Sequence, residues 1–173
     1  MPARWSAKEN VRWRVKLPAP GNSSPVVTQG KVFLSQATDG GKRRALLAFD
    51  RQTGAKLWEN GVNFPHKEPT HKTNPFCSAS PAVNGKVVMV THGSAGVFAY
   101  DLDGKKLWQR DLGPQRHLWG NASSPVPYGD VFIQLWGPGP RVFLTALDAA
   151  TGKTIWKRDL PEAKGKDEKH WFG

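Results

Sequence analysis

The sequence has little cysteine and no long apolar run. One cysteine, Cys77, occurs among 173 residues, which excludes an intrachain disulfide and a zinc site built from several cysteines. No segment approaches the roughly 20 apolar residues that cross a bilayer as a helix. The N-terminal MPARWSAKEN lacks the apolar core of a signal peptide, so the chain either stays in the cytoplasm or is exported and lacks its leader here. There is no Gly-x-Ser-x-Gly motif and nothing that indicates a Ser/His/Asp triad.

Acidic residues are few relative to basic ones. The chain has 25 Lys and Arg against 14 Asp and Glu, a net charge of +11, which suggests a polyanion as partner. The basic residues are scattered, with the densest cluster in GKRR at 41–44, whereas nucleic-acid-binding proteins concentrate charge on one face. We interpret the charge as a solvated surface and do not expect nucleic acid as the partner.

Turn-forming and large aromatic residues are abundant. The chain holds 18 Gly, 14 Pro and 8 Trp, with 38% hydrophobic and 23% charged residues overall. This composition is typical of a folded domain. Many turns together with many large side chains favour an all-β protein made of short strands.

Three segments align as internal repeats: LLAFDRQTGAKLWEN (46–60), VFAYDLDGKKLWQRD (97–111) and FLTALDAATGKTIWKRD (143–159). Each contains Ala-x-Asp, then a turn with glycine, then a tryptophan four residues after that glycine. These tryptophans are Trp58, Trp108 and Trp156, spaced 50 and 48 apart, and Trp13 lies 45 residues before the first. Such a period indicates one supersecondary unit copied along the chain.

Each repeat is predicted to form four short strands. SSPVV (23–27), SASPAV (78–83) and SSPVP (123–127) open the units, and turns centred on Gly30, Gly85 and Gly129 lead to the second strands. In the hairpin between the third and fourth strands, an aspartate accepts backbone N–H bonds and a glycine supplies the positive φ. The residues in these roles are Asp50, Asp101 and Asp148, with Gly54, Gly104 and Gly152.

Four-stranded units of about 45–50 residues predict the blades of a β-propeller. A single such sheet leaves both faces open, and stacking blades around an axis buries them, with a large aromatic side chain between neighbours. We expect the serine-rich first strand nearest the axis, where the blades are crowded, with its proline where no hydrogen-bond donor is needed.

The motif Ala48-x-Asp50-x-x-Thr53-Gly54-x-x-x-Trp58 resembles the tryptophan-docking repeat of pyrroloquinoline-quinone-like β-propellers. The copy that ends at Trp156 is similar, whereas the middle copy lacks the threonine and one residue. The resemblance covers nearly the whole chain and extends to bacterial, usually exported, uncharacterised members. It implies a periplasmic or secreted protein if a leader has been removed.

That superfamily has two well-understood branches. Quinoprotein alcohol and sugar dehydrogenases hold the quinone and Ca²⁺, whereas the propeller lipoprotein of outer-membrane β-barrel assembly is a scaffold without cofactor. The docking motif is common to both branches, so the resemblance implies the fold and leaves the activity open.

The expected organisation is a single partial β-propeller over residues 1–173. Its parts are a lone fourth strand of the closing blade (8–18), blade 1 (22–61), a connector loop (62–77), blade 2 (78–112), blade 3 (121–160) and the lead-in to a missing blade (161–173). Since propellers have about four to eight blades, we expect a fragment of a larger ring. Its open blade faces favour self-association.

One connector contains a set of candidate metal ligands. FPHKEPTHKTNPFC (64–77) includes His66, Glu68, His71 and Cys77, residue types that bind zinc. Their spacing matches no compact ligand pattern, and three prolines predict an extended loop. We therefore predict no bound metal or other cofactor, with His66, His71 and Cys77 as weak candidates.

Polar residues recur just before the innermost strands. They are Asn22, Asn74 and Asn121, together with His117 and His170 in the equivalent RHLWG and KHWFG segments. We expect them at the axial face as candidate ligand contacts, although equivalent positions in a repeat also indicate equivalent packing.

The predicted function is a non-catalytic scaffold that binds protein or a small ligand. No catalytic residue is assigned, because Asp50, Asp101 and Asp148 belong to turns. The resemblance implies, for many quinone enzymes, a disulfide between adjacent cysteines, which Cys77 alone cannot form. Two alternatives stay open: part of a quinone- and Ca-dependent alcohol or sugar dehydrogenase, and a polyanion or nucleic-acid binder whose affinity falls steeply with salt.

Overall fold

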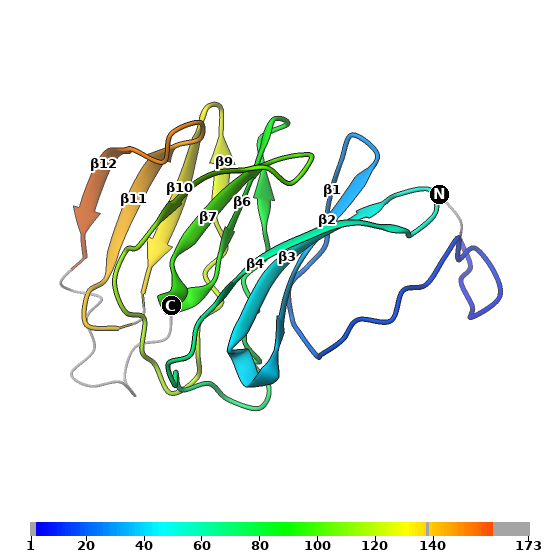
Figure 1. The fold of residues 1–173 in the computed structure, drawn as a ribbon, viewed down its shortest axis with the longest axis horizontal. Coiled ribbons are helices and arrows are strands. Elements are labelled where there is room, and N and C mark those ends of the chain that lie inside the picture. Colours follow the sequence, from blue (N-terminus) through cyan, green and yellow to red (C-terminus); the bar gives the residue numbers. More distant parts are fainter. Residues whose placement is uncertain (1–2, 138, 161–173) are drawn as a thin grey trace.

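The computed structural model describes residues 3–137 and 139–160. Within them, three antiparallel four-stranded sheets lie side by side in an arc (Figure 1). Blade 1 consists of β1 (Val26–Thr28), β2 (Lys31–Thr38), β3 (Arg43–Asp50) and β4 (Lys56–Asn63). Blade 2 consists of β5 (Ala82–Val83), β6 (Val87–Thr91), β7 (Val97–Asp101) and β8 (Lys106–Arg110). Blade 3 consists of β9 (Val126–Tyr128), β10 (Val131–Trp136), β11 (Phe143–Asp148) and β12 (Thr154–Asp159). The all-β partial propeller is confirmed.

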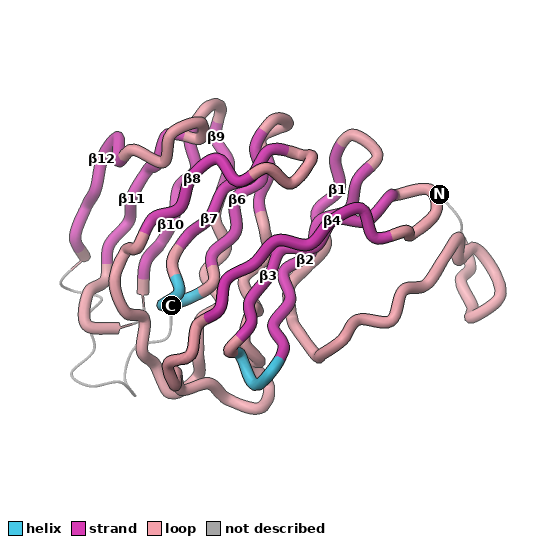
Figure 2. Tube along the Cα trace, in the orientation of Figure 1, coloured by secondary structure: helices cyan, strands magenta, loops and turns pink. Residues whose placement is uncertain are grey.

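The two edges of the arc differ in what they carry. Figure 2 shows the hairpin turns at its upper edge, and the long connectors with two short 3-10 turns, η1 (Asp39–Gly41) and η2 (Gly93–Ala95), at its lower edge. We call the lower edge the connector face. Residues distant in sequence meet there, because every connector from a fourth strand to the next first strand runs along it.

Burial follows the position of each strand in the arc. All five residues of β6 (VVMVT) are buried, because blades 1 and 3 cover both faces of blade 2. All six residues of β12 are exposed, because it is the outermost strand of blade 3 and no described sheet lies beyond that blade. The sequence VVMVT accordingly reads as a continuous apolar run, whereas TIWKRD does not.

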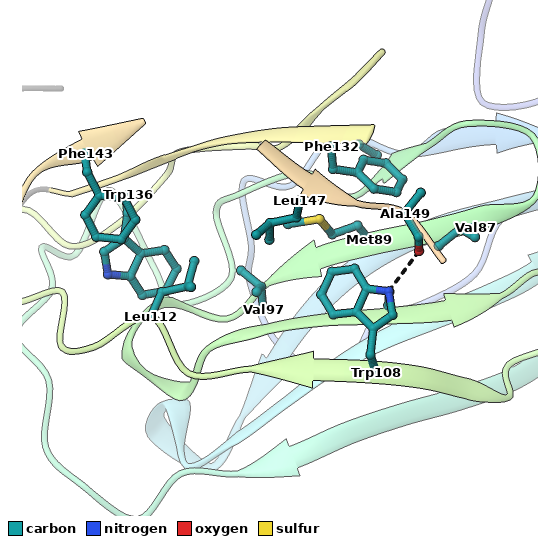
Figure 3. Close-up of a cluster of buried hydrophobic side chains, with 12 residues drawn as sticks. Val87, Met89, Val97, Trp108, Leu112, Phe132, Trp136, Phe143, Leu147 and Ala149 are labelled. Carbon is teal, nitrogen blue, oxygen red and sulfur yellow. Dashed lines mark hydrogen bonds between the residues drawn. The ribbon is translucent and has the colours of Figure 1, made fainter. Parts of the chain in front are cut away.

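Two hydrophobic clusters lie between the blades. The larger joins blades 2 and 3 and includes Met89, Trp108, Phe132, Trp136 and Leu147 (Figure 3). The second joins blades 1 and 2 around Phe33, Leu46, Val88 and Tyr100, with Trp58 partly buried against it. The sheets are therefore held together by side chains between them, as expected for blades.

The same irregularity recurs in every outer hairpin. The register shifts between Ala48 and Phe49, between Ala99 and Tyr100, and between Ala146 and Leu147. In each blade the alanine before the shift pairs with the repeat tryptophan: Trp58, Trp108 or Trp156. A bulge adds local twist and redirects a side chain, so the repeated bulge gives the three indoles equivalent positions.

Two expectations about strands need correction. Residues 8–18 form no strand, because a fourth strand needs a third strand beside it and none of the described residues supplies one. The innermost strands also begin later than expected, after Pro25, Pro81 and Pro125, since proline has no N–H to donate to the sheet. The predicted lead-in at 161–173 lies outside the described residues.

Candidate functional site

Three of the repeat tryptophans contact the hairpin turn of the blade that follows them. The indole Nε1–H of Trp58 donates to the carbonyl of Leu102 at 3.1 Å, and that of Trp108 donates to Ala149 at 2.8 Å. Trp13 makes the same bond to Arg51 at 2.9 Å. All three acceptors directly follow the repeat aspartate, so the contact is one interaction made three times.

The turn glycines are required where these indoles lie. A Cβ at Gly152 would stand 2.6 Å from Cδ2 of Trp108, and one at Gly104 would stand 2.8 Å from Cδ2 of Trp58. Gly54 is equivalent, with Cδ2 of Trp13 at 2.6 Å. All three glycines also have positive φ, between 69° and 93°. The repeat glycine therefore serves both the turn and the docking of the indole.

A second polar contact lies two residues after the tryptophan. Asn60 Nδ2 donates to the carbonyl of Gly104 at 2.6 Å, and Arg110 Nη1 donates to that of Gly152 at 2.5 Å. In blade 3 the corresponding residues are Trp156 and Arg158. Trp156 is 42% exposed, against 8% for Trp108, because no described blade follows.

The repeat aspartates are occupied by their own turns. Asp50 Oδ1 accepts from the backbone and hydroxyl of Thr53 at 2.7 and 2.9 Å, and Asp148 Oδ1 accepts from Thr151 at 2.8 and 2.7 Å. These bonds lower the pKa of both carboxyls, chiefly through the threonine donors. Asp101, in the shorter turn, accepts from the N–H groups of Asp103 and Lys105. Their role is structural.

Two rows of polar contacts run from blade to blade near the innermost strands. The Ser24 N–H donates to Ser80 Oγ at 2.8 Å, and the Ser80 N–H donates to Ser124 Oγ at 2.9 Å. The repeated serine phrase therefore joins neighbouring blades just before each proline.

The asparagines form the second row. Asn22 Nδ2 donates to the carbonyl of Thr73 at 2.8 Å, and Asn74 Nδ2 donates to that of Trp119 at 2.6 Å. Asn121 Nδ2 instead donates to the carbonyl of Gln115 at 3.1 Å. Asn22 and Asn74 therefore link each repeat to the segment that leads into the next.

The candidate histidines divide between buried and undescribed positions. His117 is 3% exposed, and its Nδ1 accepts from the Trp119 N–H at 3.3 Å. His170 lies outside the described residues. His117 is thus part of the folded lead-in to blade 3.

The three weak metal candidates are not brought together. His66 is exposed against Phe64, whereas His71 bonds Thr73 and contacts the Trp119 ring. Cys77 is buried, with Sγ 3.7 Å from Nδ1 of His92, and burial raises the pKa of its thiol to about 12. Residues 3–137 and 139–160 contain no group of three or more histidine, cysteine or acidic side chains placed to hold a metal ion.

The connector face instead holds a buried ion pair that sequence reasoning missed. Arg44 Nη2 and Glu68 Oε2 are 2.6 Å apart, and both side chains are 3% exposed. The guanidinium also donates to the carbonyls of Gly41 and His92 and lies over the rings of Phe64 and Phe76. Arg44 belongs to the GKRR cluster, so interpreting that cluster as wholly solvated was wrong at this position.

Glu68 joins all three blades. While Oε2 pairs with Arg44 of blade 1, Oε1 accepts from the N–H and hydroxyl of Ser94 in blade 2. Oε1 also accepts from Asn121 Nδ2, which precedes blade 3, at 3.4 Å. One connector carboxylate thus fixes three repeats. The burial of Arg44 could have been predicted from the sequence, because the apolar residues of β3 follow it directly.

Comparison with known proteins agrees with this repeat geometry. The sequence profile of the family described as outer membrane protein assembly factor BamB matches residues 5–70 and 40–172. The chain belongs to this family. Polyvinylalcohol dehydrogenase of Sphingopyxis sp. (strain 113P3) is 26% identical over 172 residues, 90% of the chain and 25% of that protein. BamB of Burkholderia pseudomallei (strain K96243) is 28% identical over 116 residues, 66% of the chain and 28% of that protein.

A solved structure shows the shared fold. A europium-containing methanol dehydrogenase superimposes with a TM-score of 0.66 at 17% identity, covering 91% of this chain and 27% of its own. The chain therefore spans about a quarter of the length of these relatives. The relatives of the chain include both an assembly factor and a dehydrogenase. None of the described helices is long and apolar enough to cross a membrane.

The described carboxylates do not fit a Ca²⁺ site of the dehydrogenase kind. Ca²⁺ takes six to eight oxygen ligands, usually with several carboxylates. Both oxygens of Glu68 are engaged by Arg44, Ser94 and Asn121. The hairpin turns that contain the repeat aspartates lie at the upper edge of the arc, opposite the connector between β4 and β5 to which Glu68 belongs (Figure 2).

Proposed function

We propose that this chain is a non-catalytic part of a repeat scaffold that binds protein partners, or a small ligand, through the faces of its propeller. The observation that supports it is that the carboxylates of the described repeats serve hairpin turns and the buried ion pair, while Trp156 is 42% exposed on the side of blade 3 that no described blade covers. Its counterparts Trp58 and Trp108 are each covered by a turn of the neighbouring blade. On blade 3 the equivalent indole, which is apolar and has an N–H donor, is therefore available to a binding partner.

Further apolar side chains are exposed on the same blade. Val126 is 57%, Tyr128 76% and Ile155 54% exposed. Ile155 neighbours Trp156 on β12, whereas Val126 and Tyr128 lie on β9 at the other edge of the sheet, so both edges of blade 3 expose apolar side chains. The carboxylates of the described repeats, by contrast, serve turns and the buried pair, which favours binding over catalysis.

We propose that the protein acts in the periplasm or outside the cell.

Site-specific photo-crosslinking tests the scaffold function. A photoreactive phenylalanine analogue replaces Trp156 in one variant and Leu107 in the control, which is 40% exposed on the outer strand of blade 2. The proposal predicts a defined protein adduct in bacterial cells from position 156 and none from position 107. Equal labelling at both positions, or none at either, would contradict it.

A quinone dehydrogenase is the second candidate, supported by the similarity to polyvinylalcohol dehydrogenase over 90% of the chain. Pyrroloquinoline quinone and Ca²⁺ are added to the protein, and alcohol-dependent dye reduction is measured. The scaffold proposal predicts no reduction above the quinone blank. Turnover that requires both quinone and Ca²⁺ would establish the dehydrogenase instead.

Polyanion binding, the third candidate, loses one residue of its densest basic cluster, because Arg44 is buried in an ion pair. We expect weak binding to nucleic acid, measured by fluorescence anisotropy across salt concentrations. A steep decline of a submicromolar affinity with salt would contradict this expectation.

A further inference from the structure

A small cavity with polar and apolar walls lies beside the buried ion pair on the connector face. Its volume is about 20 Å³, and its walls include Glu68, Cys77, Thr91, His92 and Asn121. These residues come from the connector, from the end of β6 and from the segment before blade 3. The cavity is therefore placed where three parts of the propeller meet.

Three residues that line the cavity each have a buried polar atom without a hydrogen-bond partner in the part of the chain that the structure describes: Thr91 Oγ1, His92 Nε2 and Asn121 Oδ1. Thr91 is 4% and His92 1% exposed. Leaving a buried polar group unpaired costs about 1–3 kcal/mol each. Three such atoms in the wall of one cavity indicate a molecule that satisfies them together.

The protonation states of the wall define what that molecule must offer. Burial and the nearby arginines lower the pKa of His92 to about 3, so its ring is neutral at pH 7. Burial keeps Cys77 as a thiol, which we assign as the donor to His92 Nδ1 across 3.7 Å. His92 Nε2 then carries the ring proton and is a donor, whereas Asn121 Oδ1 is an acceptor.

We propose that this cavity binds one ordered water molecule, which accepts from His92 Nε2–H, donates to Asn121 Oδ1 and bonds the Thr91 hydroxyl. A buried water needs about 10–15 Å³ and typically makes about three hydrogen bonds; this cavity has about 20 Å³, and its lining residues carry three unpaired polar atoms. A cation is disfavoured by the protonated Nε2 and by Arg44, and an anion by Glu68. The water joins blade 2 to the lead-in of blade 3, beside the contacts of Glu68.

A crystal structure of the 173-residue chain at about 1.5 Å resolution is the primary test. The proposal predicts one spherical density peak within hydrogen-bonding distance of Thr91, His92 and Asn121. An empty cavity, or a peak with the anomalous signal of a metal ion, would overturn it.

Two matched variants extend the test to solution. Thr91→Val removes the cavity hydroxyl, whereas Thr145→Val removes an equally buried hydroxyl that donates to the Trp156 carbonyl at 3.0 Å. Oxygen-17 magnetic relaxation dispersion counts long-lived internal waters. We expect Thr91→Val to lose one and Thr145→Val to lose none. The same count in wild type and Thr91→Val would refute the assignment of Thr91, and the crystal structure decides the case if a variant does not fold.

Discussion

Replacing Trp108 should show how strongly one docked indole joins two blades. Its side chain is 8% exposed and donates to the Ala149 carbonyl at 2.8 Å. Removing a buried aromatic side chain typically costs about 3–5 kcal/mol, so we expect Trp108→Ala to lower the free energy of unfolding by that amount. The loss includes the buried apolar area between blades 2 and 3 (Figure 3) and a carbonyl left without its donor.

Trp156→Ala is the matched control, because Trp156 has the same place in its repeat and no turn among the described residues covers it. Trp156 is 42% exposed, whereas Trp108 is 8% exposed, so about a third more of the Trp156 side chain is in water. For an indole this is roughly 80 Å², which corresponds to about 2 kcal/mol less stabilisation by burial. We expect Trp156→Ala to cost about 2 kcal/mol less than Trp108→Ala. Urea denaturation followed by circular dichroism measures both. Equal losses in the two variants, or a loss below about 1 kcal/mol for Trp108→Ala, would refute the docking argument.

Four further substitutions test individual contacts by the same urea assay. At Gly129, φ is 55° and nothing lies within 4 Å of an added Cβ, so Gly129→Ala should lower the free energy of unfolding only by the about 1–2 kcal/mol that a left-handed residue costs. Gly152→Ala should lower it clearly more, because the added Cβ would meet the docked indole of Trp108. Equal losses in the two variants would count against that contact. Glu68→Ala leaves Arg44 buried without its partner and should cost about 3–5 kcal/mol, so a near-neutral result would contradict the buried pair. His92 has a folded pKa of about 3 against 6.5 unfolded, so the unfolded state binds the extra proton between these values. Stability should therefore fall as pH drops below 6.5, by up to about 1.4 kcal/mol per unit, and His92→Phe should flatten that slope; an unchanged slope would refute the assignment.

The sequence predicts the repeat well because the interactions within a blade are local. Asp148, Thr151 and Gly152 form their turn within five residues, so spacing alone indicates it. The short apolar segments between turns likewise indicate the strands. The partner of each indole was also predictable in kind, since equal spacing in a repeat implies equal contacts.

Contacts across the connectors could not be read from the sequence in the same way. Arg44 and Glu68 are 24 residues apart, and the pair is found in one repeat only, so no repeated pattern marks the two residues as partners. The absence of a strand at 8–18 has a similar cause, because strand formation there depends on a neighbour that the described residues do not provide. Both outcomes depend on tertiary context rather than on local propensity.

Hydrogen exchange of the indole N–H groups, followed by nitrogen-15 NMR, tests most directly whether each repeat tryptophan docks on the next blade. The account predicts slow exchange for Trp58 and Trp108, whose N–H groups donate to Leu102 and Ala149, and fast exchange for Trp156. It also predicts that Trp156 becomes protected when a partner covers blade 3. Fast exchange at Trp108, or protection of Trp156 equal to that of Trp108 in the isolated chain, would contradict it.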